Sequence, residues 1–578
     1  MSTALTPTIA EPRSGELSHK QILTILSGLM LGMFLASLDQ MIVATAIRTI
    51  GDDLHGLSIQ AWVTTAFLIT STISTPLYGK LSDIYGRKPL FLFAIATFII
   101  GSALCGLATS MYMLAGFRAL QGIGAGGLMS MALAIMGDII PPRERARYQG
   151  YFMAVFATSS VLGPVVGGFF AGQSSILGVT GWRWIFYVNV PIGIIALVVV
   201  TRVLKLEHTR QSQRIDFMGA TALIVGLVPL LLIAEQGRVW GWGSTGAFAC
   251  YVVGLAGLAA FVRIERAMGD DALLPLRLFR NGTFAIGSAQ STIIGIGMFG
   301  GMASIPLYLQ IVKGASPTKA GLLVLPMVAG IMISSLVAGQ VTARTGRYRI
   351  FPILGSALLV VGMLLMSLVA ADTSLVQVDL SMLVFGAGLG MNMQTVVLAM
   401  QNAVSPRDMG VATAATTFFR QVGGTLGTAV FLSILFSSAG SNIATEYHKA
   451  ATDPAFQAAA RAHPDQLASL GSGTNLNDTS FLHGLDTRLA HPFLTGFSNA
   501  MDVVFLVGAA VLVIAFVLSL RLKEVPLRTQ SGLEAARAAA AAQDPDVQDA
   551  GGATHAPESG STASVTETEA RTLAGGHP

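Results

Sequence analysis

Charged residues are scarce in this sequence. Only 11% of its 578 residues are Asp, Glu, Lys or Arg, and 52% are hydrophobic, whereas an ordinary soluble domain carries roughly 25% charged residues. This composition excludes a water-soluble globular enzyme, because a single core could not bury so much apolar surface. The 35 Lys and Arg exceed the 31 Asp and Glu by too little to indicate nucleic-acid binding.

Residue types that form disulfides, metal sites and catalytic centres are scarce as well. The two cysteines, Cys105 and Cys250, both lie in apolar stretches, which argues against an extracellular disulfide framework. None of the nine histidines lies in an apolar segment of helix length, and no HExxH, GxSxG or Walker-type motif occurs. We therefore expect no metal ion, no other cofactor and no enzymatic activity. Residues 1–21 are polar and contain no apolar run, so we also expect no cleavable signal peptide.

Long apolar segments, in contrast, recur along most of the chain. A helix that spans a membrane needs about 20 apolar residues, and 14 segments of this kind predict an all-α membrane protein with 14 transmembrane helices. The predicted segments are 22–48, 58–78, 90–108, 112–137, 149–171, 183–204, 217–235, 245–263, 282–311, 318–341, 350–370, 376–400, 410–436 and 497–521.

Basic residues are distributed unevenly between the two sides of these segments. The loops after even-numbered segments contain most of the Lys and Arg, whereas the opposite short loops contain only Arg183, Arg238, Lys313 and Lys319. Cytoplasmic loops are enriched in Lys and Arg, so both termini are predicted to be cytoplasmic, with the chain in the cytoplasmic (plasma) membrane. All five tryptophans then fall at the outer interface, where Trp is favoured.

A weak internal repeat suggests how the segments are grouped. The sequence GKLSDIYGRK at 79–88 recurs in altered form as GQVTARTGRYR at 339–349, which indicates a duplicated unit. We expect two six-helix bundles with two inserted helices between them. The predicted parts are a cytoplasmic N-terminal tail (1–21), an N-terminal bundle (22–206), the inserted helices (207–275), a C-terminal bundle (276–522) with a long external loop (440–495), and a disordered cytoplasmic tail (523–578).

One acidic side chain is predicted to lie deep in the hydrocarbon. Asp39 falls within the first segment, whereas the other acids lie in loops, tails or near segment ends. A charge at that depth is costly unless it faces a cavity or a partner, so it marks a candidate functional site. Arg118 in the fourth segment lies at a similar depth and is the predicted partner. Desolvation favours a protonated carboxyl group and a nearby cation favours the ionised form, so the pair suits proton coupling; a structural ion pair is the alternative.

A second basic residue is predicted near the middle of the membrane. Arg420 lies in the thirteenth segment, and no deep acid of the second bundle balances it. We expect a substrate cavity lined by Asp39, Gln40, Gln121, Arg420 and Gln421. Such a cavity is better suited to monocations, neutral amphiphiles or anions than to dications. An Arg420 bonded to helix carbonyls would instead be structural.

The fifth segment carries a helix breaker among small residues. Gly163, Pro164, Gly167 and Gly168 allow the helix to bend and a neighbouring helix to approach closely. Such a helix suits a surface at which two bundles rock against each other.

Together these motifs resemble the major facilitator superfamily and, within it, the family of 14-span drug:proton antiporters. The resemblance covers nearly all of residues 22–522. Arg118 with Gln121 is similar to a motif of span four linked to proton transfer, residues 163–168 resemble the antiporter signature of span five, and Asp39 within LDQMIV corresponds to the family's acid of span one. Residues 79–88 resemble the loop between spans two and three, which implies a conformational latch formed by Gly79, Asp83, Gly86, Arg87 and Lys88.

The chain departs from the family at a few positions. Met41, Ala44 and Arg48 stand where Thr, Asn and Pro are usual, and Ser159 stands where Gly is common. The resemblance implies a monomer in the lipid bilayer that exchanges protons for lipophilic drugs or other amphiphilic small molecules by alternating access. A dedicated exporter of a native lipid, siderophore or secondary metabolite is the alternative, and a membrane sensor that transports nothing is a further one.

Overall fold

The fold is that of a helical membrane protein. The structure is a computed structural model that describes residues 19–55, 61–141, 144–204, 216–315, 317–405, 408–466, 482 and 484–527. Apart from turns and short 3-10 segments, the described residues are helical except for a hairpin of two strands, β1 (Ser175–Ile176) and β2 (Val179–Thr180). The predictions for residues 1–18 and for the tail from 528 onward lie outside the described residues.

Each of the 14 predicted segments lies largely within one helix or within two consecutive helices. In chain order the helices are α1 (His19–Asp53), α2 (Ala61–Tyr85), α3 (Arg87–Gly106), α4 (Met111–Ile139), α5 (Arg145–Ala171), α6 (Trp184–Tyr187), α7 (Asn189–Val203), α8 (Phe217–Trp240), α9 (Thr245–Met268), α10 (Gly282–Ile311), α11 (Pro317–Leu323), α12 (Leu325–Thr345), α13 (Ile350–Met366), α14 (Leu375–Ala403), α15 (Met409–Ala450), α16 (Pro454–Ala462) and α18 (Thr487–Leu520).

Twelve helices of the described residues are long and apolar enough to cross a membrane. Of the remaining candidates, α13 is apolar but only 17 residues long. The other, α2, has 25 residues, and its many Ser and Thr side chains lower its hydropathy. The fold is therefore an all-α membrane fold, but the predicted number of 14 spans is not confirmed.

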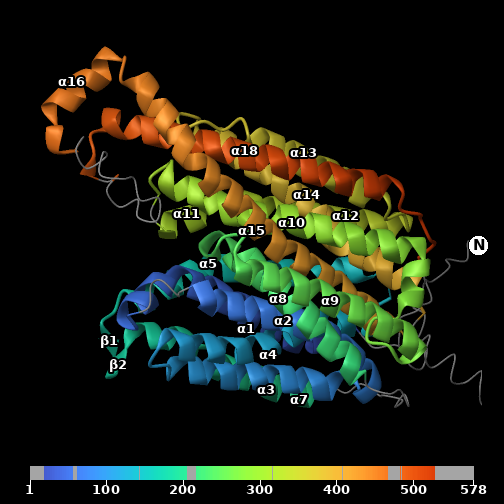
Figure 1. The fold of residues 1–578 in the computed structure, drawn as a ribbon. Coiled ribbons are helices and arrows are strands. Elements are labelled where there is room, and N and C mark those ends of the chain that lie inside the picture. The colour runs from blue at the N-terminus through green and yellow to red at the C-terminus, as the bar shows by residue number, and fades with distance from the viewer. Residues whose placement is uncertain are drawn as a thin grey trace, which may run out of the picture.

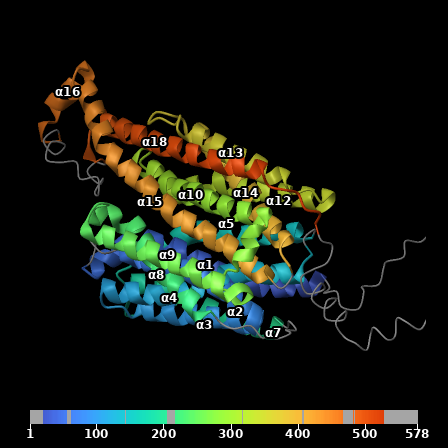
Figure 2. The same cartoon turned by 45° about the vertical axis from the view of Figure 1, so that its right-hand side comes forward.

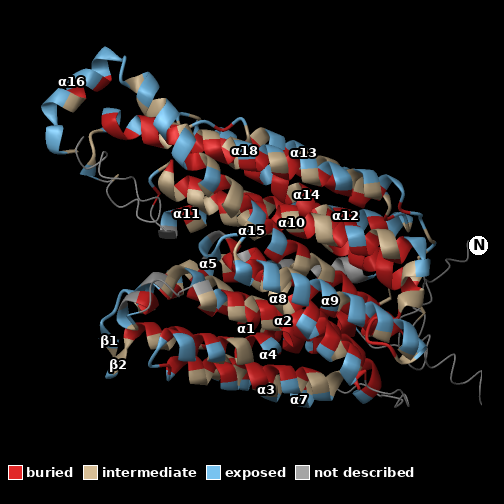
Figure 3. Cartoon of the chain, in the orientation of Figure 1, coloured by how far each residue is buried: buried red, intermediate tan, exposed pale blue. Residues whose placement is uncertain are grey.

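The helices form two groups in which the same pairs pack in the same order. In the first group (α1–α7), α4 packs on α2 and α3, and α1 packs on α5 and α7. In the second group (α10–α18), α14 packs on α12 and α13, and α10 packs on α15 and α18. The two groups lie side by side in Figures 1 and 2, and Figure 3 shows their buried residues concentrated between the helices.

The two groups touch each other and share a third element. Helix α2 contacts α15, and α5 contacts α12. The pair α8 and α9 lies at the junction of the groups, where α8 packs on both α2 and α15 (Figure 1). Any change in the relative position of the groups must therefore be accommodated at α8.

The segment 440–495, which is predicted to be a long external loop, contains helical structure at both of its ends. Helix α15 continues to Ala450, α16 follows it, and α18 begins at Thr487. Tyr447, Phe456 and Leu489 from these three helices share a small apolar cluster, and the Tyr447 hydroxyl donates to the carbonyl of Leu489 at 3.1 Å. A helix that continues beyond the membrane needs no unbroken apolar run, because its polar face can meet water.

Candidate functional site

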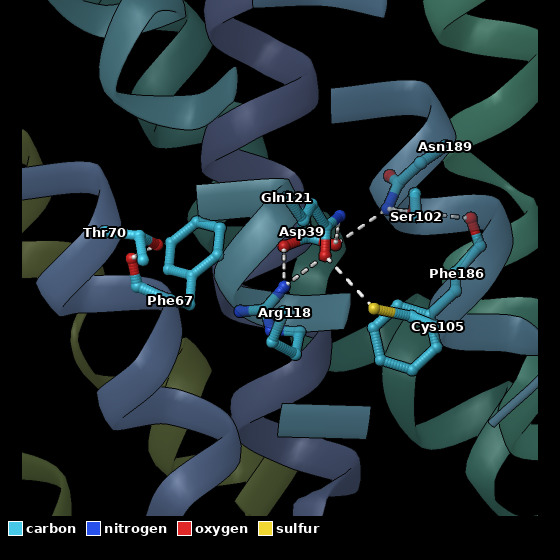
Figure 4. A network of polar contacts seen from close by, with 9 residues as sticks. All are labelled: Asp39, Phe67, Thr70, Ser102, Cys105, Arg118, Gln121, Phe186 and Asn189. Carbon is cyan, nitrogen blue, oxygen red and sulfur yellow. Dashed lines mark hydrogen bonds and ion pairs between the residues drawn. The ribbon is translucent and has the colours of Figure 1, made fainter. Parts of the chain in front are cut away.

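Asp39 lies inside the first group with its predicted partner (Figure 4). Its side chain is fully buried. Oδ2 of Asp39 accepts a hydrogen bond from Nη1 of Arg118 at 2.6 Å, and Oδ1 accepts one from Nε2 of Gln121 at 2.9 Å. The same Nη1 of Arg118 donates to Oε1 of Gln121 at 2.7 Å. Helices α1 and α4 thus bring together Asp39, Arg118 and Gln121.

Two neutral residues that were not predicted extend this network. Asn189, the first residue of α7, donates from Nδ2 to Oδ1 of Asp39 at 2.7 Å and to Oγ of Ser102 at 3.1 Å. The Ser102 hydroxyl donates in turn to the carbonyl of Phe186 at 2.9 Å. Asn189 and Ser102 are uncharged, so a search of the sequence for buried charges does not detect them. Asn189 is a polar residue inside the apolar segment 183–204, which is a signal in the sequence that could have pointed to it.

The charge on Arg118 is balanced by one carboxylate and by an aromatic ring. Its guanidinium carbon lies 4.0 Å from the centroid of the Phe67 ring, a favourable place for a cation. Among the described residues, Nε of Arg118 is buried without a hydrogen-bond partner. Because breaking a buried ion pair costs roughly 3–5 kcal/mol, the charge state of Asp39 strongly influences where the Arg118 side chain is stable.

The repeat between the two groups extends to single glycine contacts. Gly163 of α5 lies against Met41 of α1, and Gly423 of α15 lies against Thr292 of α10, each so closely that an added β-carbon would collide. Such close approach between helices requires glycine. The two contacts set a register in which Met41 corresponds to Thr292.

In this register, the position of the second group that corresponds to Asp39 is occupied by a neutral residue. Gln290 corresponds to Asp39, because each lies two residues before the glycine contact. Gln290 is fully buried, and its Nε2 donates to Oδ1 of Asn392 at 3.3 Å and to Oγ of Ser356 at 3.5 Å. An amide cannot take up a proton at neutral pH, so the two groups differ in the one property that proton coupling needs.

A cavity of about 180 Å³ lies between the two groups. Its lining comes from α1, α4 and α5 of the first group and from α10, α12, α14 and α15 of the second. The lining residues are Met33, Ser37, Gln40, Met41, Met129, Leu133, Phe152, Val155, Phe156, Met298, Phe299, Met302, Ile331, Leu389, Met393, Gln394, Thr417, Arg420 and Gln421. Six of them are methionines, whose flexible side chains adapt to ligands of different shape.

The cavity contains three of the five residues predicted for it. Gln40, Arg420 and Gln421 line it, whereas Asp39 and Gln121 do not, because they belong to the buried network inside the first group. Among the described residues, the Arg420 guanidinium makes no hydrogen bond or ion pair. It is therefore not bonded to helix carbonyls, as the structural alternative required, and it is the one charged side chain in the lining.

The predicted bending helix, α5, contacts both groups. Gly163 and Gly167 lie against α1, and Gly168 has no heavy atom within 4 Å of its β-carbon position. Pro164 lies inside α5, and a β-carbon added to Gly321 of α11 would be 3.3 Å from its Cγ. This short stretch of α5 therefore lies between the helix that holds Asp39 and the second group.

Three of the predicted latch residues lie against the start of α15. Arg87 pairs with Asp83 at 2.7 Å and with Asp138 of α4 at 2.7 Å. A β-carbon at Gly410, the second residue of α15, would collide with Asp83 and Arg87, and one at Gly79 would collide with α15 as well. The ion-paired cluster thus packs against the second group.

The other two predicted latch residues, Gly86 and Lys88, lie at contacts within the first group. Gly86 has φ 95°, a conformation that favours glycine, and it separates α2 from α3. Lys88 donates from Nζ to the carbonyl of Thr201 at 2.7 Å, at the end of α7. The structure therefore separates Lys88 from the contact with α15.

A polar bridge beside the latch was not predicted. Nη2 of Arg277 lies 2.8 Å from Oδ1 of Asp408, which precedes α15, and Nε of Arg277 lies 2.6 Å from Oδ1 of Asp270. Nζ of Lys80 on α2 donates to the carbonyl of Asp270 at 3.2 Å. The segment after α9 thus joins the first group to the second at the same end of the molecule as the latch.

Comparisons with known proteins agree with this geometry. The family model described as Major Facilitator Superfamily matches residues 29–428. Multidrug transporter protein MdtP of Bacillus subtilis (strain 168) is 35% identical over 74% of this chain and 78% of its own length. The tetracycline resistance determinant of Streptomyces rimosus is 39% identical over 54% of this chain and 93% of its own.

Solved structures add the fold. The proton:xylose symporter XylE has a TM-score of 0.57 over 90% of this chain and 100% of its own, at 16% identity. Helices that could cross a membrane, a cavity shared by two repeated groups and the match over most of the chain agree with one another. This chain is an integral multi-pass membrane transporter that belongs to the major facilitator superfamily.

Proposed function

We propose that this chain is a proton-coupled antiporter that exports lipophilic drugs or other amphiphilic small molecules by alternating access. The observation that carries the proposal is the buried Asp39 network. Gln40, the next residue of α1, lines a cavity shared by both groups. The relatives named multidrug transporter and tetracycline resistance determinant support a drug-like cargo.

Helix α1 connects the proton site to the cavity. Asp39 bonds to α4 and α7, whereas the adjacent Gln40 lines the cavity. A proton on Asp39 removes the charge that holds Arg118 and weakens the bonds between α1 and α4. Helix α1 can then shift against α5, to which it is closely packed at Gly163. Release of the proton to the other side restores the ion pair and resets the cycle.

The cavity lining favours neutral and singly charged amphiphiles. Arg420 repels dications, and the methionines and Phe side chains offer apolar contacts to many shapes. A volume of about 180 Å³ is below the roughly 300–1,000 Å³ typical of pockets for drug-sized ligands. In this proposal the cavity widens when the groups separate at one face.

The proposal includes the arrangement in the membrane. Helices α2 and α13 would complete 14 spans, because each packs along helices that are long enough to cross. Both termini would lie in the cytoplasm of a cell whose plasma membrane holds a monomer. The groups 22–206 and 276–522 would rock about α8 and α9 of the inserted part.

Transport in inverted membrane vesicles tests the proposal. We expect an imposed pH gradient to drive uptake of a lipophilic monocationic dye, and Asp39→Asn to abolish that accumulation. Exchange of labelled for unlabelled dye without a gradient should persist in Asp39→Asn, because Asp39 does not line the cavity. The matched control is Asp379→Asn, which neutralises an acid near the start of α14 and should transport normally.

Each other outcome contradicts part of the proposal. Gradient-driven uptake that survives Asp39→Asn would exclude Asp39 as the coupling group. Equal losses in the two variants would exclude a specific role for Asp39. If no dye moves, the drug-like cargo is wrong, and a native lipid, siderophore or secondary metabolite becomes the cargo to test.

A further inference from the structure

A groove of about 670 Å³ lies where α9 ends, outside the site described above. It is bounded by the last turns of α9 and by the 3-10 segment η4 (Leu276–Arg280) that leads to α10. Its lining residues are Val262, Glu265, Arg266, Gly269, Asp270, Leu276, Arg277, Phe279 and Arg280. The basic loops place this end of α9 on the cytoplasmic side of the membrane.

Two arginines of the groove are free to bind a ligand. The side chains of Arg266 and Arg280 are exposed and make no hydrogen bond or ion pair with the described residues. Arg277 is paired with Asp270. The remaining acid, Glu265, is buried, and its Oε2 accepts a hydrogen bond from the backbone nitrogen of Leu274 at 2.9 Å. The accessible charge of the groove is therefore positive.

A separate apolar crevice lies further along the same helix. It has a volume of about 320 Å³ and lies between α8, α9 and α15. Leu258 lines the crevice and Val262 lines the groove, and residues four apart share one helix face about 6 Å apart. From Arg266 back to Leu258, which lines the crevice, α9 rises about 12 Å. One leaflet of the hydrocarbon core is about 15 Å thick, so an acyl chain of a lipid held at Arg266 reaches the crevice at Leu258.

The faces of α9 beside the crevice are exposed and apolar. Phe248, Val252 and Leu255 are each more than half exposed, and α9 lies at the outside of the molecule (Figures 1 and 3). In a membrane these side chains meet lipid. The groove and the crevice are thus open to the phase that would supply their ligand.

We propose that the groove and the crevice together bind one anionic glycerophospholipid. Arg266 and Arg280 hold the phosphate group, and one acyl chain lies in the crevice beside Leu258. Basic pockets between membrane helices at the cytoplasmic surface bind anionic lipid headgroups in this way. The site requires neither the Asp39 network nor the central cavity, so it stands independently of the proposed transport cycle.

Native mass spectrometry of the full-length chain in detergent, with added phosphatidylglycerol, tests this proposal. Phosphatidylcholine and phosphatidylethanolamine of the same chain length show whether binding needs a net negative headgroup, and inorganic phosphate shows whether the phosphate alone suffices. The headgroup variant is Arg266→Gln with Arg280→Gln. Its matched control is Arg263→Gln, an exposed arginine of α9 that does not line the groove.

The chain site has its own pair of variants. Leu426→Trp should fill the crevice, because Leu426 lines it from α15 and is 37% exposed. Val430→Trp is the control, because Val430 lies one turn further along α15, is 43% exposed and does not line the crevice.

We expect phosphatidylglycerol to bind more tightly than the two zwitterionic lipids and inorganic phosphate. Each arginine near an anionic lipid contributes roughly a factor of five, so the double variant should bind about 30-fold more weakly. Leu426→Trp should also weaken binding, and the two control variants should not. Equal binding of all three lipids, binding of inorganic phosphate as tight as that of phosphatidylglycerol, or controls as weak as the test variants would overturn the proposal.

Discussion

Loss of the Asn189 amide should slow transport that is driven by a pH gradient. Nδ2 of Asn189 donates to Oδ1 of Asp39 at 2.7 Å in a fully buried network. A hydrogen bond to a charged group is worth about 1.5–3 kcal/mol. Since 1.4 kcal/mol is a tenfold change in an equilibrium constant, Asn189→Ala should slow gradient-driven dye uptake roughly 10- to 150-fold.

The expected loss follows from what the bond holds in place. Without the Asn189 donor, Asp39 keeps its bonds to α4 but loses its bond to α7, so the carboxyl that carries the proton in the proposed cycle is less well positioned. The assay measures the initial rate of dye uptake into vesicles under a fixed pH gradient. Ser102→Ala is the matched control, because the Ser102 hydroxyl bonds to Asn189 and Phe186 but not to Asp39, and its loss of uptake should be much smaller. An Asn189→Ala variant with an unchanged uptake rate, or a Ser102→Ala variant that loses as much, would refute the reasoning.

Three further variants test other parts of the structure. Arg420→Gln removes the charged side chain of the cavity lining, so uptake of a monocationic dye should rise relative to that of an anionic dye of similar size; an unchanged ratio would contradict a cavity role. Gly167→Leu places a side chain against α1 and should lower stability to heat by about 1–3 kcal/mol, whereas Gly168→Leu, which faces open space, should not; similar unfolding temperatures in detergent would disprove the close packing. Asp408→Asn removes an ion-pair partner of Arg277, which is 35% exposed, so we expect at most about 1 kcal/mol of stability to be lost together with easier separation of the groups, measured by labelling of cysteines placed in the cavity.

The charged residues of the site can be predicted from the sequence, because an ionisable residue within a membrane-spanning helix is rare and usually has a function. Asp39 and Arg118 stand out by depth alone, and they are bonded in the structure. Asn189 and Ser102 escape prediction because a neutral side chain in a membrane helix needs no charge partner. Arg420 lies in the lining of the cavity, whereas Gln121 lies in the Asp39 network. The sequence alone does not indicate which face of α4 meets the first group and which meets the cavity.

The limits of the fold prediction have similar causes. Apolar runs locate helices that meet lipid, so each of the 14 segments lies largely within one helix or two consecutive helices. The polar ends of α15 and α18 have no such run and are predicted as part of a loop. The ion pair of Arg277 with Asp408 joins residues 131 positions apart. Both lie in short connecting segments between long helices, so only the packing of the groups reveals the contact.

If the proposed antiport cycle holds, the neutral Gln290 at the position of Asp39 has a consequence for how the membrane potential acts on transport. In the proposed antiport cycle, Asp39 is the one carboxyl at these two positions, so one proton would enter for each molecule exported. Exchange of one proton for a monocation moves no net charge across the membrane. Exchange of one proton for a neutral molecule moves one elementary charge inward, and exchange for a monoanion moves two. Each charge is worth about 2.3 kcal/mol per 100 mV. The voltage of an energised cell would therefore favour expulsion of anions most strongly and leave export of monocations to the pH gradient alone.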